Sequence, residues 1–311
     1  MAAPLITVVT PCYNEEPNVR EIYRAVKEEF AALPQYRYEH LFIDNGSRDA
    51  TPAILRELAA GDPGVKVILN TRNFGPIRSP VYGLLQAQGD AVIGIAADFQ
   101  DPPALIPKLL AAWSGGARIA LGVKLESDEH WLMYRIRDTY YRWLAKVADV
   151  AVVHQATGFG IYDQRVIAAL RQIADPYPFL RGLVAEVGYE IVRIPFRQEV
   201  RRAGVSKIST YQLFDVALQG VVSHSKVPLR IATLTGVVTA FLSMLVGFGY
   251  LVAKLAMWNS FNLGIAPLVI GFFFISGVQL IFVGVVGEYV GAIYTYVKNR
   301  PLVHESERLN F

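Results

Sequence analysis

Apolar runs alternate with helical patterns over the first 124 residues. Five runs rich in β-branched residues are predicted as strands: Leu5–Thr10, Tyr38–Ile43, Val65–Leu69, Ala91–Ala96 and Arg118–Val123. Helical periodicity lies between them, over Val19–Phe30, Pro52–Ala60, Ser79–Gln88 and Ala104–Trp113. Strands that alternate with helices in this way are typical of βαβ units. We therefore predict an α/β domain with a mostly parallel sheet.

The pattern changes near residue 230. No Asp, Glu, Lys or Arg occurs in Ile231–Ala253 or in Leu255–Gly287. Since about 20 apolar residues cross a bilayer, we predict two membrane helices, near 231–253 and 266–291. Basic residues precede the first helix and follow the second, which predicts a multi-pass membrane protein with both termini in the cytoplasm. Recurrent glycines in the second helix are compatible with a homo-oligomer.

Just before the first membrane helix, Tyr211–Val222 has an apolar and a polar helical face. Such a helix lies in the membrane interface or packs on the soluble domain, and amphipathicity does not distinguish these. We expect four parts: a cytoplasmic α/β domain at 1–208, this juxtamembrane helix at 209–228, the membrane helices at 229–297 and a cytoplasmic tail at 298–311.

Composition narrows the class of protein. The chain has 311 residues, of which 53% are hydrophobic and 18% charged, which excludes a disordered chain. A net charge of +3 without a basic run argues against a nucleic-acid partner. The single cysteine, Cys12, forms no internal disulfide, and the five histidines lack the spacing of a zinc site.

Polar and acidic residues follow four successive strands. These segments are Pro11–Glu16, Asp44–Ser47, Asn70–Gly75 and Asp98–Pro103. Each alone is compatible with an ordinary turn. Because the carboxyl ends of parallel strands meet at one edge of a sheet, together they predict a binding crevice there.

Carboxylates at this edge indicate a divalent cation. The chain lacks a glycine-rich phosphate loop after the first strand. Carboxylates repel a diphosphate unless a cation lies between them. Asp98 and Gln100 are two residues apart, so in an extended segment they point the same way and suit Mg²⁺ or Mn²⁺. Asp101 precedes a proline, and both a helix cap and a chemical role stay open for it.

Ordered motifs now indicate a family. The opening Pro11-Cys-Tyr-Asn-Glu-Glu, the turn Asp44-Asn-Gly-Ser, Arg72-Asn-Phe-Gly and Asp98-Phe-Gln-Asp-Pro-Pro occur in this order. Together with the two C-terminal membrane helices, they resemble GT-A-fold family 2 glycosyltransferases, and more narrowly the polyprenyl-phosphate glycosyltransferase group. The resemblance covers nearly the whole chain.

The resemblance implies an inverting transfer of a sugar from a nucleotide sugar to polyprenyl phosphate at the bilayer. A UDP-sugar is the favoured donor, with UDP-glucose first, and Mg²⁺ or Mn²⁺ is the cofactor. The residues implied for the nucleotide are Pro11, Tyr13, Asn14, Glu15, Asp44 and Arg72. Those implied for the metal are Asp98 and Gln100, and those for the diphosphate or acceptor are Arg201, Ser206 and Lys207. The expected catalytic residues are Asp98, Asp101, Arg201 and Lys207.

The chain departs from the family pattern at three positions. Ala96 replaces a carboxylate, Asn45 replaces an aspartate, and Phe159 replaces an acid near the acceptor. A phosphate monoester has a second pKa near ~6, so a phosphate acceptor needs no general base. A diacylglycerol hydroxyl would need one, which argues against that acceptor. A degenerate, non-catalytic nucleotide-binding scaffold stays the alternative.

Overall fold

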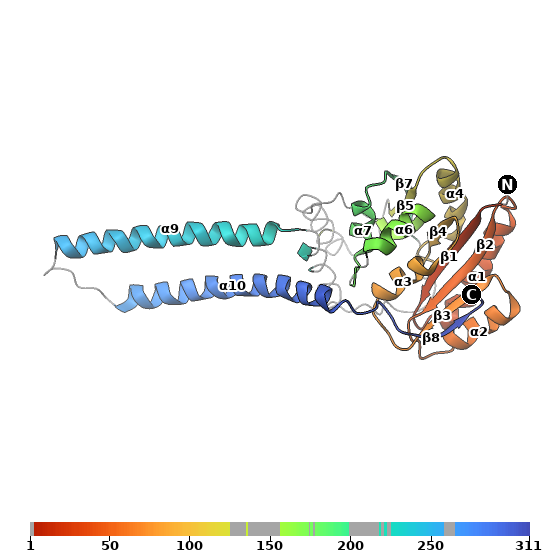
Figure 1. Ribbon diagram of the computed structural model, residues 1–311, viewed down its shortest axis with the longest axis horizontal. Coiled ribbons are helices and arrows are strands. Elements are labelled where there is room, and N and C mark those ends of the chain that lie inside the picture. Colours follow the sequence, from red (N-terminus) through yellow and green to blue (C-terminus); the bar gives the residue numbers. More distant parts are fainter. Residues whose placement is uncertain are drawn as a thin grey trace.

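The chain folds into a sheet domain from which two long helices project (Figure 1). This computed structural model describes residues 3–124, 135, 156–173, 175–176, 178–198, 218, 221–222, 225–257 and 265–311. The described strands are β1 (Leu5–Cys12), β2 (Arg37–Asp44), β3 (Val65–Asn70), β4 (Ala91–Gly94), β5 (Ile119–Lys124), β6 (Ala156–Asp163), β7 (Ile191–Phe196) and β8 (Glu305–Leu309).

The strands form one sheet in the order β7-β5-β6-β4-β1-β2-β3-β8. Its centre, β4-β1-β2-β3, is parallel, as the alternating pattern predicts. Three strands, β6, β7 and β8, were not predicted from the sequence, and β7 pairs parallel with β5. Strand β6 inserts antiparallel between β4 and β5, and β8 pairs antiparallel with the outer edge of β3.

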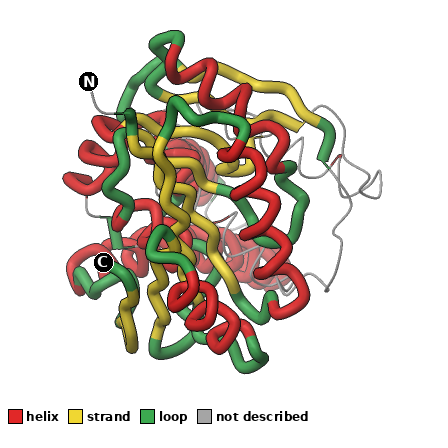
Figure 2. The backbone as a smooth tube through the Cα atoms, turned by 90° about the vertical axis from the view of Figure 1, so that its right-hand side faces the viewer, coloured by secondary structure: helices red, strands yellow, loops and turns green. Residues whose placement is uncertain are grey.

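Helices cover both faces of the sheet (Figure 2). In the domain they are α1 (Glu16–Ala31), α2 (Thr51–Gly61), α3 (Arg78–Gln86), the 3₁₀ turn η1 (Pro103–Leu105), α4 (Ile106–Ser114), α6 (Gln164–Ile173) and α7 (Leu180–Glu186). Alternation along β1 divides the core, because Val8 packs with the cluster that contains α1, while Val9 packs with the cluster that contains α6. The expected α/β fold is confirmed.

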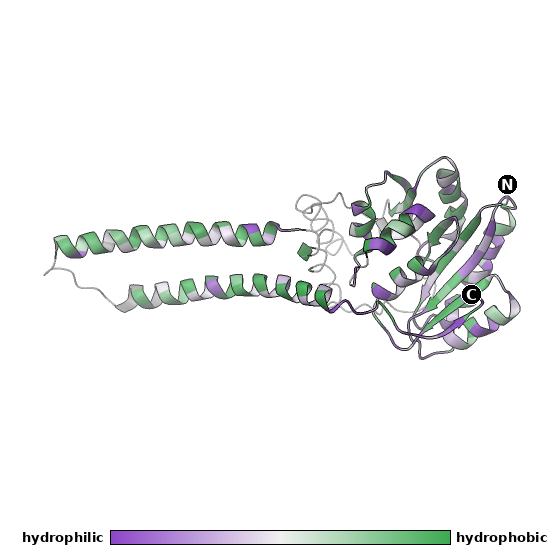
Figure 3. Ribbon diagram, viewed as in Figure 1, coloured by the Kyte–Doolittle hydropathy of each residue, from purple (hydrophilic) through white to green (hydrophobic). Residues whose placement is uncertain are grey.

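The two C-terminal helices are α9 (Val227–Ala256) and α10 (Ile265–Lys298). Both are long and apolar enough to cross a membrane, with mean hydropathies of 2.0 and 1.8 in 18-residue windows within Val227–Ala256 and Gly271–Lys298. They run side by side away from the sheet domain (Figure 1), and apolar residues dominate their surfaces (Figure 3). Exposed apolar surface on this scale indicates association with a membrane. Helix α10 continues well beyond the predicted end near residue 291.

Candidate active site

A cavity of about 180 Å³ opens at the carboxyl ends of the parallel strands. It is lined by Pro11, Cys12, Tyr13, Glu15, Asn45, Pro76, Ser79, Pro80, Ala96, Ala97 and Asp98. Three of the four predicted strand-end segments therefore contribute to one site, and the loop after β3 contributes through Pro76, Ser79 and Pro80 rather than through Asn70–Gly75. Of the predicted residues, the structure brings Pro11, Tyr13, Glu15 and Asp98 to the lining.

Asp44 organises the turn after β2. Its carboxylate accepts hydrogen bonds from the backbone N–H groups of Gly46 and Ser47, at 3.1 and 3.0 Å, and from the Ser47 hydroxyl. The Ser47 hydroxyl oxygen also accepts from the backbone N–H of Asn14 at 2.7 Å. Burial raises the pKa of the Asp44 carboxyl, although these donors act against the shift. Asp44 thereby joins the first two loops of the site.

Asn45 links this turn to the loop after β3. Its side-chain oxygen accepts from the backbone N–H of Phe74 at 2.9 Å, and its amide nitrogen donates to the carbonyl of Gly75 at 3.0 Å. The neighbouring Gly46 has φ of +73°, and a Cβ there would lie 2.5 Å from the carbonyl carbon of Arg72. Only glycine allows this close approach of the two loops.

Arg72 lies on the outer side of the same loop. Its guanidinium lies over the Phe74 ring, 4.1 Å from the centroid, and donates to the carbonyl of Asn73 at 3.0 Å. The side chain is exposed and does not line the cavity. The nucleotide role of Arg72 stays a prediction.

The loop after β4 corrects two expectations. Strand β4 ends at Gly94, and Phe99 has φ of +62°, so the segment from Asp98 to Gln100 is not extended and the two-residue spacing argument is wrong. The Gln100 backbone N–H donates to Asp98 at 3.1 Å. Of the two roles left open for Asp101, the helix cap is wrong, because Pro102 is the residue before η1 and Asp101 accepts from the Ala96 N–H at 3.2 Å; the catalytic role stays a prediction.

Comparison with known proteins decides the family. The model of glycosyl transferase family 2 matches residues 7–172. The chain belongs to glycosyl transferase family 2. It is therefore a glycosyltransferase.

This glycosyltransferase has relatives that match it over nearly their full length. The SfII prophage-derived bactoprenol glucosyl transferase of Shigella flexneri is 35% identical, over 98% of this chain and 99% of the relative. The uncharacterized glycosyltransferase YkcC of Bacillus subtilis is 32% identical, over 95% and 91%. Among solved structures, mannosyltransferase PcManGT from Pyrobaculum calidifontis, in complex with GDP-Man and Mn²⁺, has a TM-score of 0.48 and 17% identity, covering 95% of this chain and 87% of that one.

Phe159 of this glycosyltransferase belongs to the hydrophobic core. Its side chain is 2% exposed, and its ring packs edge-on against Phe196 with centroids 5.6 Å apart. A Cβ at Gly122 would lie 2.9 Å from it, so the ring fills the space above that glycine. Residue 159 lies on β6 at a position that strand alternation turns toward the core, so an apolar side chain packs there.

Several predicted groups lie outside the described residues. These are Arg201, Ser206 and Lys207, together with most of the amphipathic segment 209–228. Cys12 is buried, and burial raises the pKa of its thiol well above the usual range. Pro76, Ser79 and Pro80 also line the cavity and are not predicted from the sequence as site residues. They come within five residues after the Arg72–Gly75 motif, where the pattern indicates only a helix from Ser79.

Proposed function

We propose that this glycosyltransferase moves a sugar from a nucleotide sugar to polyprenyl phosphate at the cytoplasmic face of a membrane. One observation carries the proposal: a cavity built from four strand ends, with a buried carboxylate, sits in a chain that also has two apolar helices. Relatives named bactoprenol glucosyl transferase align with 98% and 95% of this chain, so they cover both the domain with the cavity and the two apolar helices. UDP-glucose is the donor proposed first.

At about 180 Å³ the cavity accommodates part of a nucleotide sugar, and its lining is suited to the nucleoside. Tyr13 offers an aromatic face, and Glu15 and Asn45 offer polar atoms that suit nucleoside hydroxyl and carbonyl groups. Pro11 and Asn14 belong to the same loop and complete the proposed nucleotide site. Contact between Asp44 and the base is part of the proposal. The carboxylate already holds its own turn, so this contact would use its remaining acceptor capacity.

A divalent cation fits the chemistry of this donor set. The part of the chain that the structure describes contains no group of three or more His, Cys, Asp or Glu residues that could hold a metal ion. Mg²⁺ and Mn²⁺ suit a site of one or two protein oxygens, because substrate phosphates and water supply the other ligands. Asp98 would hold the cation, with Gln100 as a proposed second ligand. When bound, the cation neutralises charge on the departing diphosphate.

The acceptor supplies its own nucleophile. A phosphate monoester is largely dianionic at pH 7, since its second pKa is near ~6. The protein then needs only to align acceptor and donor and to stabilise the leaving diphosphate. Direct attack on the anomeric carbon, opposite the leaving group, inverts its configuration. The basic loop with Arg201, Ser206 and Lys207 is proposed to meet the phosphates.

The chain path supports the proposed membrane topology. The sheet pairs β3 of the N-terminal domain with β8, which comes after α10. Both ends of the chain therefore lie on the same side of any membrane that α9 and α10 cross. Lys226 and Arg230 at the start of α9, and Lys298 and Arg300 at the end of α10, support a cytoplasmic location for that side.

Ala96 favours a second candidate function, a nucleotide-binding scaffold. It lines the cavity at a position where the family pattern has a carboxylate. One experiment separates the two. Purified protein is incubated with undecaprenyl phosphate, Mn²⁺ or Mg²⁺ and a panel of nucleotide sugars, and nucleoside diphosphate release is measured with and without lipid. Lipid-dependent release from one donor supports the transferase. Nucleotide binding without release from any donor supports the scaffold.

A further inference from the structure

The C-terminal segment 301–311 returns from the membrane helix to the sheet domain. Strand β8 pairs with β3, so that Ile68 lies opposite Arg308 and Asn70 opposite Glu305. Figure 1 shows the segment running from the end of α10 along the outer edge of the sheet. The segment therefore covers the edge strand next to the loop that reaches the cavity.

Its first residues contact that loop directly. The carbonyl of His304 accepts from the backbone N–H of Thr71 at 2.9 Å. The His304 ring lies 6.0 Å from the Phe74 ring, within the usual range for an aromatic pair. Val303 is buried. The carbonyl of Pro301 accepts a hydrogen bond from the Arg78 guanidinium at the start of α3.

Phe74 is held by contacts from two separate parts of the chain. Its backbone N–H donates to Asn45, a residue that lines the cavity. Its ring is 7% exposed and contacts the Arg72 guanidinium on one side and His304 on another. The loop 71–75 is thus fixed by the cavity wall and by the C-terminal segment together.

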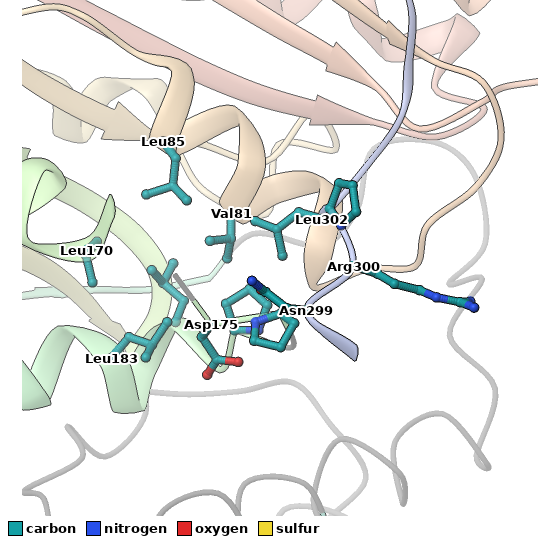
Figure 4. Close-up of a pocket in the computed structure, with 12 residues that line it drawn as sticks. Val81, Leu85, Leu170, Asp175, Leu183, Asn299, Arg300 and Leu302 are labelled. Carbon is teal, nitrogen blue, oxygen red and sulfur yellow. The ribbon is translucent and has the colours of Figure 1, made fainter. Parts of the chain in front are cut away.

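The chain is also docked on the sheet domain where α10 ends. Residues 299–302 line a cavity of about 280 Å³ with α3, α6 and α7 (Figure 4). Leu302 lies near Val81 of α3, while Arg300 points away from the cavity. At the last turns of α10, the Tyr296 hydroxyl donates to Asp175 at 3.0 Å. Helix α3 also begins beside the active-site cavity, at Ser79 and Pro80.

We infer that His304 is a positioning residue for the donor site, because it supports the loop 71–75 from outside and connects that loop to α10. The inference rests on the proposed function, in which Asn45 and its cavity receive the nucleotide sugar. No transfer step passes through His304. Its ring and carbonyl restrict the loop, so that less freedom is lost when the donor binds.

Two substitutions at one position test the ring contact. Full-length protein in detergent carries His304→Ala, which removes the ring, or His304→Phe, which restores one. Loss of an aromatic pair corresponds to about a three- to tenfold change in an equilibrium constant. We expect His304→Ala to raise the KM for UDP-glucose by that factor, with kcat and the KM for undecaprenyl phosphate unchanged. His304→Phe retains the wild-type value.

Glu307→Gln is the matched control. It weakens the ion pair between Glu307 of β8 and Arg56 of α2, and Glu307 lies opposite Leu69 of β3 rather than opposite the loop 71–75. We expect its KM for UDP-glucose to stay at the wild-type value. The inference is overturned if His304→Ala leaves that KM unchanged, if His304→Phe behaves like His304→Ala, or if Glu307→Gln raises it equally.

Amide hydrogen exchange separates failure of this inference from failure of the proposed function. Exchange of the peptide containing residues 71–75 is measured without nucleotide, so it needs no transfer activity. Faster exchange in His304→Ala than in Glu307→Gln supports the positioning role, even if the wild type transfers no sugar. Equal exchange in the two variants overturns it.

Discussion

Asn45 uses both ends of its side-chain amide on the backbone of the loop that contains Phe74. The oxygen accepts from the Phe74 N–H at 2.9 Å, and the nitrogen donates to the Gly75 carbonyl at 3.0 Å. These two partners fix the orientation of the amide, because one can only donate and the other can only accept. An ionised carboxylate has no proton to donate to Gly75. Asparagine at this position therefore has a structural reason.

We expect Asn45→Asp to raise the KM for the nucleotide sugar about tenfold, since an unmade buried hydrogen bond costs about 1–3 kcal/mol. Steady-state kinetics with varied donor measures this. Asn310→Asp is a matched control, because Asn310 also donates to backbone carbonyls, those of Ala59 and Val65, away from the cavity. It should lower stability but leave the donor KM unchanged. Equal KM values for Asn45→Asp and wild type would show that the Gly75 contact is irrelevant to the donor.

Substitutions of Asp101 distinguish a role of its negative charge from a role of its hydrogen bond to the loop after β4. Its carboxylate accepts from the Ala96 N–H at 3.2 Å, and an asparagine oxygen can accept the same hydrogen bond. We expect Asp101→Asn to keep kcat within a few-fold of wild type, and Asp101→Ala to lower it at least tenfold as the loop that holds Asp98 loosens. If the asparagine variant is as inactive as the alanine variant, the carboxylate charge itself is required, as the sequence analysis expected.

Phe159 is predicted to act through stability. Restoring the family acid by Phe159→Asp places a carboxylate where the side chain is 2% exposed, at a cost of several kcal/mol. Thermal unfolding in detergent should show a large fall in Tm. Ala111→Asp introduces the same acid at an exposed site on α4 and should change Tm little. A stable Phe159→Asp protein with altered lipid preference would instead return this position to the acceptor site.

The pH dependence of stability is predicted from His40. Its ring is fully buried against Phe42 and contacts the Thr10 hydroxyl, and burial lowers its pKa to about 3. In the unfolded chain, the His40 imidazole binds a proton below about pH 6.5. In the folded protein, the same imidazole stays neutral until about pH 3. The neutral form of His40 therefore contributes stability at neutral pH, and this contribution is lost as the pH falls from about 6.5 to about 3. The loss amounts to about 2 kcal/mol from pH 7 to pH 5.

His40→Gln removes this titration. The variant is less stable than wild type at pH 7, and its deficit should shrink as the pH falls to 5. Chemical denaturation at both values measures the difference. A deficit that does not depend on pH would mean that His40 is not buried in its neutral form.

The sequence predicted the local architecture where pattern and topology agree. Alternating runs such as Leu5–Thr10 gave the parallel core, and polar strand ends gave the cavity, because parallel strands bring their carboxyl ends together. Strand β8 was missed because Glu305–Leu309 is charged and pairs with β3 across more than 200 residues. The helix-cap alternative for Asp101 failed because the proline after it resembles a helix start, whereas the helical turn begins at Pro103. Such contacts depend on tertiary packing, which the pattern of residues along the chain does not predict.

The central claim is that the sugar is moved to a lipid phosphate. The most direct measurement is mass spectrometry of undecaprenyl phosphate after incubation with UDP-glucose, Mn²⁺ and either wild type or Asp98→Asn, with Glu57→Gln as an exposed control. Wild type and Glu57→Gln should add one hexose to the lipid, and Asp98→Asn should add essentially none while remaining folded. UDP release with an unmodified lipid, or normal lipid glycosylation by Asp98→Asn, would contradict the account.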